Sequence, residues 1–444
     1  MGLFRGALSF IGLVWKLGRS RSAREQLRLI LGRESFAPPL PPDDPEFIDV
    51  RTLLTTWTIE ELNESADEYF RLHPDVVAYL GKPFSDVTET SDQLITFGQV
   101  VNGLNASRGS DVLDFGAGTC WSTRFLVQMG YSVTAMDVSP TALEIGQELF
   151  RRVPCTGHHA PPKFLVFDGR RFDLPDESFD RIVCLNAFHH VPNPEDVLKE
   201  MARVLRPGGI AGFSEPGSGH SFTPQAQHEM RNFKVIENDI DIEAIERWAL
   251  DAGFSRLELA VVDSRSYRVG WREYSDLIAG GVSAEQYVDT VRTAALSRRL
   301  FFLRKRGVEI PDSRQRPGLN GVVRIQLDAS QVAAGGEFHG TAYVENTGTN
   351  TWLPSDAKFG PVLLGVHLFS QDGKRLDHDF CRAALPGGLP PGESATFHIA
   401  LPSPPPGDYR FVFDLVSEQV CWFAENGARP VTVDVSVRRP VDLS

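Results

Sequence analysis

The sequence has few cysteines, no excess of positive charge and no long apolar run. Its five cysteines are scattered among 444 residues without a C-x-x-C pair, so neither a disulfide framework nor a structural zinc site is expected. The formal net charge is -13, which argues against nucleic acid as a partner, because nonspecific nucleic-acid binding depends on basic groups that neutralise phosphates. These absences favour an ordinary folded protein of a reducing cytoplasm.

The N-terminal segment, residues 1–35, is basic and amphipathic. Phe4, Leu8 and Ile11 fall on one face of a predicted helix whose other face is polar. Its apolar run is too short to span a bilayer, which needs about 20 residues, and no small-residue cleavage site follows it. We expect residues 1–33 either to lie at the inner face of the membrane, where acidic lipids attract arginines, or to pack on protein.

Pattern changes divide the rest of the chain. Residues 36–57 are rich in proline and are predicted to be a stiff linker. Residues 58–308 open with a Thr58–Glu61 capping box, and short β-like runs then alternate with helical ones, which predicts a parallel sheet with crossover helices. The runs are DVLDF, SVTAMDV, KFLVFD, DRIVCLN and GIAGFSE. RLELAVVD and RRLFFLRK are expected as edge strands, and the polar helical insert between them, 266–297, is expected to cover the ligand-binding end of the sheet.

The last part of the chain has another pattern. Residues 309–320 are predicted to be a second linker, rich in proline, glycine and arginine. Between 321 and 438, short strand-like runs are separated by glycine, proline and asparagine turns, which predicts an antiparallel sandwich without helices. The expected fold class is therefore α/β, a Rossmann-like sheet with flanking helices, followed by an all-β sandwich domain.

One stretch, DVLDFGAGTCWSTRF (residues 111–125), runs from a strand through two glycines into a helix. A dinucleotide fingerprint would place a third glycine where Trp121 stands, and no lysine followed by Ser or Thr closes the turn as in a P-loop. Asp114 would repel a pyrophosphate but suits a ligand with an ammonium group. The turn therefore favours a cationic nucleoside ligand.

These residues resemble the class I S-adenosylmethionine-dependent methyltransferases of type 11, over roughly residues 66–305. In that family the glycines let the backbone approach the methionine portion, and the acidic residue beside them orients its amino group. Asp137 in AMDVSP matches the acidic residue that bonds the ribose, and Asp168 in VFDGRR matches the one that meets the adenine. LPDESFDRIVCLNAFHHV and VLRPGG complete the match. The resemblance implies S-adenosylmethionine as cofactor, bound by Asp114, Gly116, Ala117, Gly118, Asp137, Val138, Asp168, Gly169 and Asn186.

Catalytic candidates should follow the fourth and fifth strands, where open α/β sheets place their ligands. His190, beside His189, matches a family histidine that often packs next to the cofactor, so it is either a structural residue or a base. Glu215 and His220 lie in the glycine-rich loop SEPGSGHS and are either acceptor contacts or partners in loop hydrogen bonds. The stretch VPCTGHHAPP has no second ligand pair at zinc-site spacing, so no metal is expected.

Two further resemblances bear on the acceptor. The segment after the fifth strand resembles methyltransferase domains found beside bacterial glycosyltransferases, and the sandwich resembles immunoglobulin-like modules of surface-polysaccharide enzymes. They imply methyl transfer to a sugar hydroxyl of a glycan or lipid-linked glycan, with a small metabolite as the alternative acceptor. A third interpretation is an inactive protein that binds carbohydrate or protein. Trp352 and Trp422 either stack on sugar rings or belong to the sandwich core.

Overall fold

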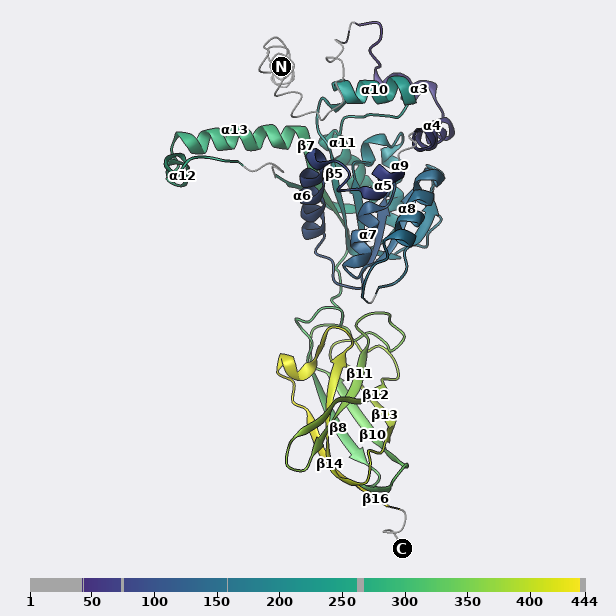
Figure 1. The fold of residues 1–444 in the computed structure, drawn as a ribbon, viewed down its shortest axis with the longest axis vertical. Helices are drawn as coiled ribbons and strands as arrows, with labels where there is room; N and C mark the ends of the chain where they lie inside the picture. Colours follow the sequence, from purple (N-terminus) through teal and green to yellow (C-terminus); the bar gives the residue numbers. More distant parts are fainter. Residues whose placement is uncertain (1–41, 43, 73–75, 158, 262–266, 440–444) are drawn as a thin grey trace. The chain divides into compact units, whose positions relative to one another are not determined.

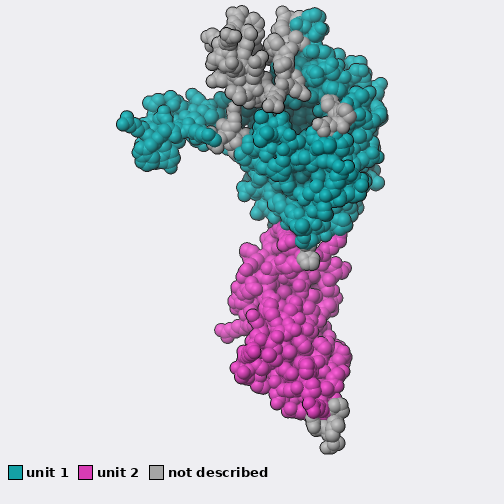
Figure 2. Space-filling model, in the orientation of Figure 1, with its two compact units in different colours: residues 1–106, 110–308 teal, residues 107–109, 309–444 magenta. Residues whose placement is uncertain are grey.

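The computed structural model describes residues 42, 44–72, 76–157, 159–261 and 267–439. These fall into two compact units, one within residues 1–106 and 110–308 and the other within 107–109 and 309–444 (Figure 2). The predicted basic amphipathic segment, residues 1–35, lies outside the described residues. Within the described ranges, every helix is too short or too polar to cross a bilayer.

The first unit is built on a seven-stranded sheet with strand order β3-β2-β1-β4-β5-β7-β6 (Figure 1). Neighbouring strands from β3 to β5 run parallel, and β7 runs antiparallel to β5 and to β6. The carboxyl ends of the parallel strands therefore meet at one edge. The strands are β1 (Asp111–Phe115), β2 (Ser132–Asp137), β3 (Lys163–Val166), β4 (Phe179–Leu185), β5 (Leu205–Pro216), β6 (Phe254–Ala260) and β7 (Arg298–Lys305).

Helices cover both faces of this sheet because strand residues alternate between two cores. Leu113 of β1 packs in a cluster with residues of α9 and α11, whereas the preceding Val112 packs with α6 and α7. The helices of this unit are α3 (Val50–Thr56), α4 (Ile59–Leu72), α5 (Val76–Gly81), α6 (Val87–Leu104), α7 (Trp121–Gln128), α8 (Pro140–Arg152), α9 (Pro194–Val204), α10 (Pro224–Phe233), α11 (Ile242–Ala252), α12 (Trp271–Ile278) and α13 (Val282–Ser297).

Helix starts follow the predicted chemistry in one case and depart from it in another. The Thr58 amide donates to Glu61 and the Glu61 amide donates to the Thr58 hydroxyl, so the capping box is present. Asn193 precedes Pro194 at the start of α9, but its side chain makes no cap bond. It donates instead to the Gly169 carbonyl at 3.1 Å, which ties α9 to the loop after β3.

Three predictions about this unit were wrong in part. The linker 36–57 ends early, because Leu53 of α3 is buried against Ala226 and Met230 of α10. The insert does not cover the sheet edge. Figure 1 shows α12 and α13 extending away from the sheet, and Trp271 and Ile278 are 78% and 70% exposed. RRLFFLRK forms β7 between β5 and β6, so it is an interior strand.

The second unit is a two-sheet sandwich around one hydrophobic core. One sheet has the order β13-β10-β8 and the other β12-β11-β14-β16-β9, with β15 paired to β14. Residues of both sheets share one buried cluster. The strands are β8 (Gly321–Leu327), β9 (Gln331–Ala333), β10 (Glu337–Asn346), β11 (Val362–Ser370), β12 (Arg375–Ala384), β13 (Ser394–Pro402), β14 (Gly407–Ser417), β15 (Cys421–Trp422) and β16 (Val431–Arg438). The immunoglobulin-like assignment stays a prediction.

Two details of the sandwich correct the sequence analysis. Residues 309–320 are not a free linker, because Ser313 is buried and donates to the Gly360 carbonyl. The two tryptophans considered for sugar stacking are both occupied by protein. Trp352 is fully buried in the core, and the Arg382 guanidinium lies 4.4 Å from the ring centroid of Trp422. The half-buried Trp422 ring also lies 4.0 Å from the His367 ring, centroid to centroid, so protein side chains already pack against both tryptophans.

Candidate functional site

The turn between β1 and α7 contains two glycines with different surroundings. Gly116 has φ +67°, and a Cβ there would collide with the Cβ of Ala187. Gly118 has φ +51°, yet a Cβ there would meet no protein atom within 4 Å. Both need the left-handed backbone that glycine tolerates, but only Gly118 faces open space. The structure thus leaves room for a ligand against the backbone at Gly118.

Asp137, at the carboxyl end of β2, closes this turn from the side. Its Oδ2 accepts a hydrogen bond of 2.8 Å from the Gly118 amide, and its Oδ1 accepts one of 2.9 Å from Ser139. Burial raises the pKa of the Asp137 carboxyl. Val138, the next residue, is half-buried. A carboxylate is therefore fixed beside the open glycine.

Asp168 and Gly169 follow β3 at the same edge of the sheet. Asp168 is exposed, and its Oδ1 accepts hydrogen bonds from the Arg170 and Arg171 amides, which fold the loop back. Its backbone carbonyl accepts a 2.9 Å hydrogen bond from Asn63 of α4. A Cβ on Gly169 would collide with Ile59 at the start of α4. Helix α4 therefore lies against the loop that carries Asp168.

Asp114 lies beneath the turn and not on its open side. The side chain is buried, and its Oδ2 accepts hydrogen bonds of 2.9 Å from Ser122 and 2.6 Å from Thr123. Burial raises the pKa of Asp114 to about 6. The sequence analysis expected direct contact with a ligand ammonium group, whereas the structure points this oxygen at two hydroxyls of α7. Any attraction to a bound cation acts through the field of a buried charge.

The raised pKa of Asp114 leads to a testable pH dependence. Because the free carboxyl is protonated below about pH 6, we expect the affinity for a cationic nucleoside to fall by up to about tenfold per pH unit as the pH drops below 6. The raised pKa of Asp114 also affects folding, because the folded state holds the proton more tightly than the unfolded state. The free energy of unfolding of the ligand-free protein should therefore fall as the pH rises from 3.8 to about 6.

Calorimetry with S-adenosylmethionine between pH 5 and pH 8 measures this dependence. In Asp114→Asn the loss of affinity at low pH should be smaller, since one of the two buried carboxyls with a raised pKa has been removed. Equal slopes in wild type and variant would contradict a role for the Asp114 charge.

The other predicted contacts lie on the same rim. Ala117 is buried and donates its amide to the Met136 carbonyl at 3.0 Å, which holds the turn on β2. Asn186 is exposed after β4 with a positive φ of 48°. Its Oδ1 accepts a 3.1 Å hydrogen bond from Arg298 of β7. Strands β1 to β4 thus bring all nine predicted cofactor residues to one edge of the sheet.

Glu215, predicted as a catalytic candidate, is a buried anchor. Its Oε1 accepts hydrogen bonds from the Ala187 and Phe188 amides at 3.1 and 3.0 Å. Its Oε2 lies 2.7 Å from His189 Nδ1, and the whole residue is fully buried. These bonds fix the short helical turn η1 (Phe188–His190). Glu215 cannot reach an acceptor without breaking this turn, so the acceptor-contact prediction was wrong for it.

His189, His190 and His220 gather around Glu237, a residue that the sequence analysis missed. Glu237 Oε2 lies 2.5 Å from His220 Nε2 and 3.6 Å from His189 Nε2. His190 Nδ1 lies 2.5 Å from the Ile236 carbonyl and 3.7 Å from Glu237 Oε1. Burial lowers the pKa of His189, but the bonds to Glu215 and Glu237 outweigh it and raise that pKa to about 9.

A second missed residue, Asp239, ties this cluster together. Its carboxylate accepts hydrogen bonds of 2.9 and 2.8 Å from the Gly219 and Ser221 amides, which flank His220. The signal was present in VIENDIDIE, where acidic residues at alternate positions of an extended segment share one face. We define the imidazole cluster as His189, His190, His220, Glu215 and Glu237.

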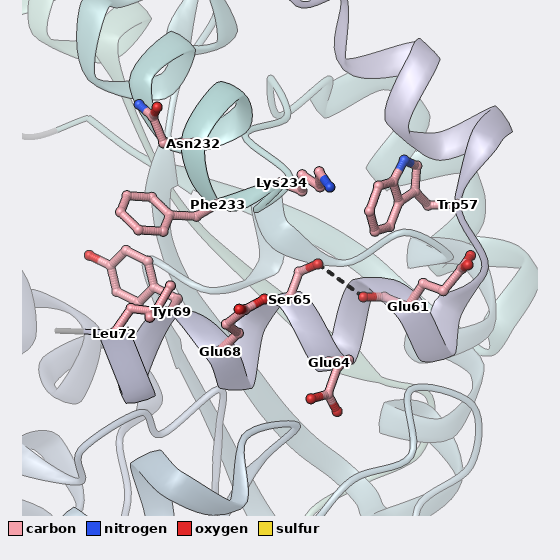
Figure 3. A pocket seen from close by; sticks show the side chains of 10 residues that line it. All are labelled: Trp57, Glu61, Glu64, Ser65, Glu68, Tyr69, Leu72, Asn232, Phe233 and Lys234. Atoms are coloured by element: carbon pink, nitrogen blue, oxygen red, sulfur yellow. Dashed lines mark hydrogen bonds between the residues drawn. The ribbon is translucent and has the colours of Figure 1, made fainter.

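A separate hollow of about 240 Å³ lies between α4 and α10 (Figure 3). Three glutamates and three aromatic residues stand out in its lining, and the Lys234 ammonium lies 4.3 Å from the ring centroid of Trp57. The lining residues are Trp57, Glu61, Glu64, Ser65, Glu68, Tyr69, Leu72, Asn232, Phe233 and Lys234. This hollow contains neither the glycine turn nor an imidazole, so we do not place the chemistry there.

The chain is similar to known methyltransferases over its sheet. Residues 113–213 match the methyltransferase domain family. Methyltransferase GfsG of Streptomyces halstedii is 29% identical over 176 residues, which cover 39% of this chain and 62% of that protein. The demethylmenaquinone methyltransferase of Renibacterium salmoninarum is 30% identical over 175 residues, which cover 37% of this chain and 70% of that protein.

A solved structure, phosphoethanolamine N-methyltransferase 2 of Haemonchus contortus in complex with S-adenosyl-L-methionine, aligns with 17% identity and a TM-score of 0.36, covering 61% of this chain and 62% of that chain. A score at this level adds nothing to the assignment. The matched segment spans less than two thirds of GfsG, so these relatives do not identify the acceptor. The family match and the identity to the Renibacterium enzyme nevertheless show that this chain belongs to the class I S-adenosylmethionine-dependent methyltransferases.

Proposed function

We propose that this chain transfers the methyl group of S-adenosylmethionine to a hydroxyl oxygen of an acceptor bound beside His220. The observation that carries this proposal is the position of His220. It lies in the loop after β5, its side chain is 20% exposed, and it is hydrogen-bonded to the buried carboxylate of Glu237. A polar group that reaches solvent there is suited to an acceptor hydroxyl.

The cofactor is inferred to lie along the rim described above. Its methionine portion would pass the open backbone at Gly118, its ribose hydroxyls would bond Asp137, and its adenine would lie near Asp168. The parallel register supports this order, because Phe115 pairs with Met136 and Asp137 pairs with Val166. Ala117, Val138, Gly169 and Asn186 would complete the walls.

Methyl transfer requires that the acceptor oxygen is aligned with the methyl group and is activated as a nucleophile. The methyl group on sulfonium is already activated, so the protein must hold the acceptor oxygen in line with the carbon–sulfur bond. A hydroxyl is a weak nucleophile unless its proton is removed or its oxygen is bound to a cation. The imidazole cluster lies beside the rim. Its histidine nitrogens are groups that accept a proton, and its carboxylates are groups that bind a cation.

The acceptor class is narrowed by two observations. The name of the Renibacterium relative, demethylmenaquinone methyltransferase, favours a quinone-type acceptor, whereas transfer to an oxygen rests on the position of His220 alone. The two tryptophans considered for sugar stacking are occupied by the protein itself, which weakens the support for a glycan. We therefore propose a hydroxyl-bearing small molecule, including a hydroquinone, ahead of a sugar hydroxyl of a glycan or lipid-linked glycan.

The test is a radiolabelled-methyl transfer screen. Full-length protein is incubated with labelled S-adenosylmethionine and, in separate arms, with hydroquinone acceptors, total lipid extract and glycan extract of the source organism. We expect labelling in the hydroquinone or lipid arm. Labelling of glycan alone would favour the sugar acceptor, and no label in any arm, with intact cofactor binding, would support the inactive interpretation.

Once an acceptor is found, His220 gives a sharper prediction. His220→Ala should lower kcat about 100-fold, in the range that one group activating an acceptor contributes, while the affinity for S-adenosylhomocysteine stays unchanged. His228→Ala, a change at an exposed histidine of α10, is the matched control and should leave kcat as in wild type. An undiminished kcat in His220→Ala would refute acceptor activation at this position.

A further inference from the structure

We propose that His189, His220 and Glu237 form a binding site for a divalent metal ion of the zinc type, open on one side to an acceptor oxygen. The metal site stands on the geometry of these three side chains. Only the second part, that the ion takes the acceptor oxygen, rests on the proposed function. The sequence analysis expected no metal, because VPCTGHHAPP has no second ligand pair at zinc-site spacing, and it did not consider Glu237.

The donor atoms have the right chemistry and spacing. One ligand atom from each of His189, His220 and Glu237 lies within 4.8 Å of the others. Two imidazole nitrogens and one carboxylate oxygen are a ligand set used by catalytic zinc sites, which keep a fourth position open. Tetrahedral ligands at about 2.1 Å from an ion lie about 3.4 Å apart. The 3.6 Å between His189 Nε2 and Glu237 Oε2 already meets this. His220 Nε2 and Glu237 Oε2, now 2.5 Å apart in a hydrogen bond, would have to separate by about 0.9 Å to bind one ion.

His189 is oriented for metal binding by a carboxylate behind it. Its Nδ1 lies 2.7 Å from Glu215 Oε2, so its other nitrogen, Nε2, points toward Glu237. Metal-bound histidines usually make this kind of hydrogen bond to a carboxylate, which fixes the tautomer and the ring orientation. Glu215 is itself held by the backbone amides of η1. The ligand is therefore set in place before any ion arrives.

The other two ligands come from segments that are tied together. Asp239 accepts hydrogen bonds from the amides on either side of His220. The Asn238 amide, next to Glu237, donates to the His189 carbonyl at 3.2 Å. Hydrogen bonds to backbone groups thus hold three segments together: the loop after β5, the segment before α11 and the turn η1. A site of fixed geometry requires such support.

Charge and access also suit an ion. Glu215 and Glu237 are two buried carboxylates within one cluster, so a cation bound there would meet negative charge. His220 is the partly exposed member of the three ligands, with 20% of its side chain accessible, against 5% for His189 and 8% for Glu237. The open coordination position therefore faces the side from which an acceptor would enter.

A bound ion would complete the proposed reaction. The acceptor hydroxyl oxygen would take the open position, where the positive charge lowers its pKa and its proton passes to solvent. The oxygen lone pair would then form the new oxygen–carbon bond as the carbon–sulfur bond breaks. The electron pair of that bond stays on sulfur, which leaves neutral S-adenosylhomocysteine.

The test uses tag-free full-length protein, freed of metal with a chelator and titrated with Zn²⁺ in a calorimeter. We expect one Zn²⁺ per chain, and Co²⁺ in its place should give the visible absorption bands of a four- or five-coordinate site. His220→Ala and Glu237→Gln should each weaken Zn²⁺ binding about 100-fold or more. The control His228→Ala should bind as wild type. Thermal melts check folding, since Zn²⁺ should raise the Tm of wild type and of His228→Ala but not that of the two ligand variants.

Four outcomes overturn or separate the claims. No uptake of Zn²⁺ by wild type would overturn the metal site, and the cluster would then be neutralised by a proton. Wild-type binding retained in both ligand variants would overturn it as well, because the ion would lie elsewhere. Stoichiometric binding without methyl transfer would refute the proposed function alone, whereas methyl transfer that persists in metal-free protein would refute the role of the ion in the reaction.

Discussion

Gly118→Ala is expected to weaken binding of S-adenosylmethionine by about 100-fold, or about 2.7 kcal/mol, while the protein stays folded. The reason is the open space at this glycine. A Cβ there meets no protein atom within 4 Å. The added methyl group would therefore enter the space in which the cofactor lies against the protein backbone. The left-handed backbone adds a strain of about 1–2 kcal/mol to the folded state.

Gly116→Ala is the matched control for this prediction. It lies two residues earlier, also has a positive φ, and so carries the same backbone strain. Its Cβ, however, would collide with Ala187 in the protein interior, and overpacking of this kind typically costs 1–3 kcal/mol more. We therefore expect the larger loss of stability in Gly116→Ala and the direct loss of affinity in Gly118→Ala, measured by thermal melts and calorimetry. Equal affinity of Gly118→Ala and wild type would contradict the placement of the cofactor.

Glu215→Ala is expected to destabilise the first unit by about 3–5 kcal/mol, the cost of removing one partner of a buried charged pair. The change leaves the amides of η1 without their acceptor and leaves His189 without its carboxylate partner. Glu215→Gln keeps one acceptor oxygen, so its effect should be smaller. This prediction replaces the role as an acceptor contact that the sequence favoured.

The chain has two compact units, so a global melt does not report on the first unit alone. Amide hydrogen exchange at residues 187–190 reports on the turn that Glu215 holds, and its protection should fall in Glu215→Ala. Protection at the buried strand β11 of the second unit should not change. A variant with normal protection in η1 and a selective loss of kcat would restore Glu215 as an acceptor contact.

The sheet of the first unit was predictable because its central strands, β1, β2, β4 and β5, are largely buried and read as apolar runs between helix caps. The order of motifs along Asp114, Gly118, Asp137 and Asp168 then indicated the cofactor edge. What the sequence could not give was the direction of individual side chains. Asp114 turned out to face the hydroxyls of α7, a choice made by tertiary packing and not by local pattern.

The position of close helix–helix packing is a second feature that could not be predicted from the sequence. Trp121 occupies the position where a dinucleotide fingerprint has its third glycine, and its ring packs 5.7 Å from Phe97 and 5.9 Å from Phe125. The tight approach is made elsewhere. A Cβ on Gly146 of α8 would collide with Cys120 at the start of α7. The sequence alone does not show whether a glycine in the middle of a helix, such as Gly146, lies at a close contact with another helix.

Strand β12 (Arg375–Ala384) carries little strand signal in its sequence, for a physical reason. It is the edge strand of its sheet, and most of its residues are exposed or half-buried. Its stretch RLDHDFCRAA therefore shows neither an apolar run nor a clean alternation. Glu237 and Asp239 were missed for another reason. The acidic alternation of their segment is visible in the sequence, but their partners are identified only when the segment after α10 returns to His189 and to the loop after β5.

The most direct test of the whole account is a titration of the full-length protein with S-adenosylmethionine at pH 7.5 by calorimetry, with Gly118→Ala beside it. The account predicts saturable binding at one site per chain, weakened about 100-fold in the variant. An absence of binding to wild type at millimolar ligand would contradict it.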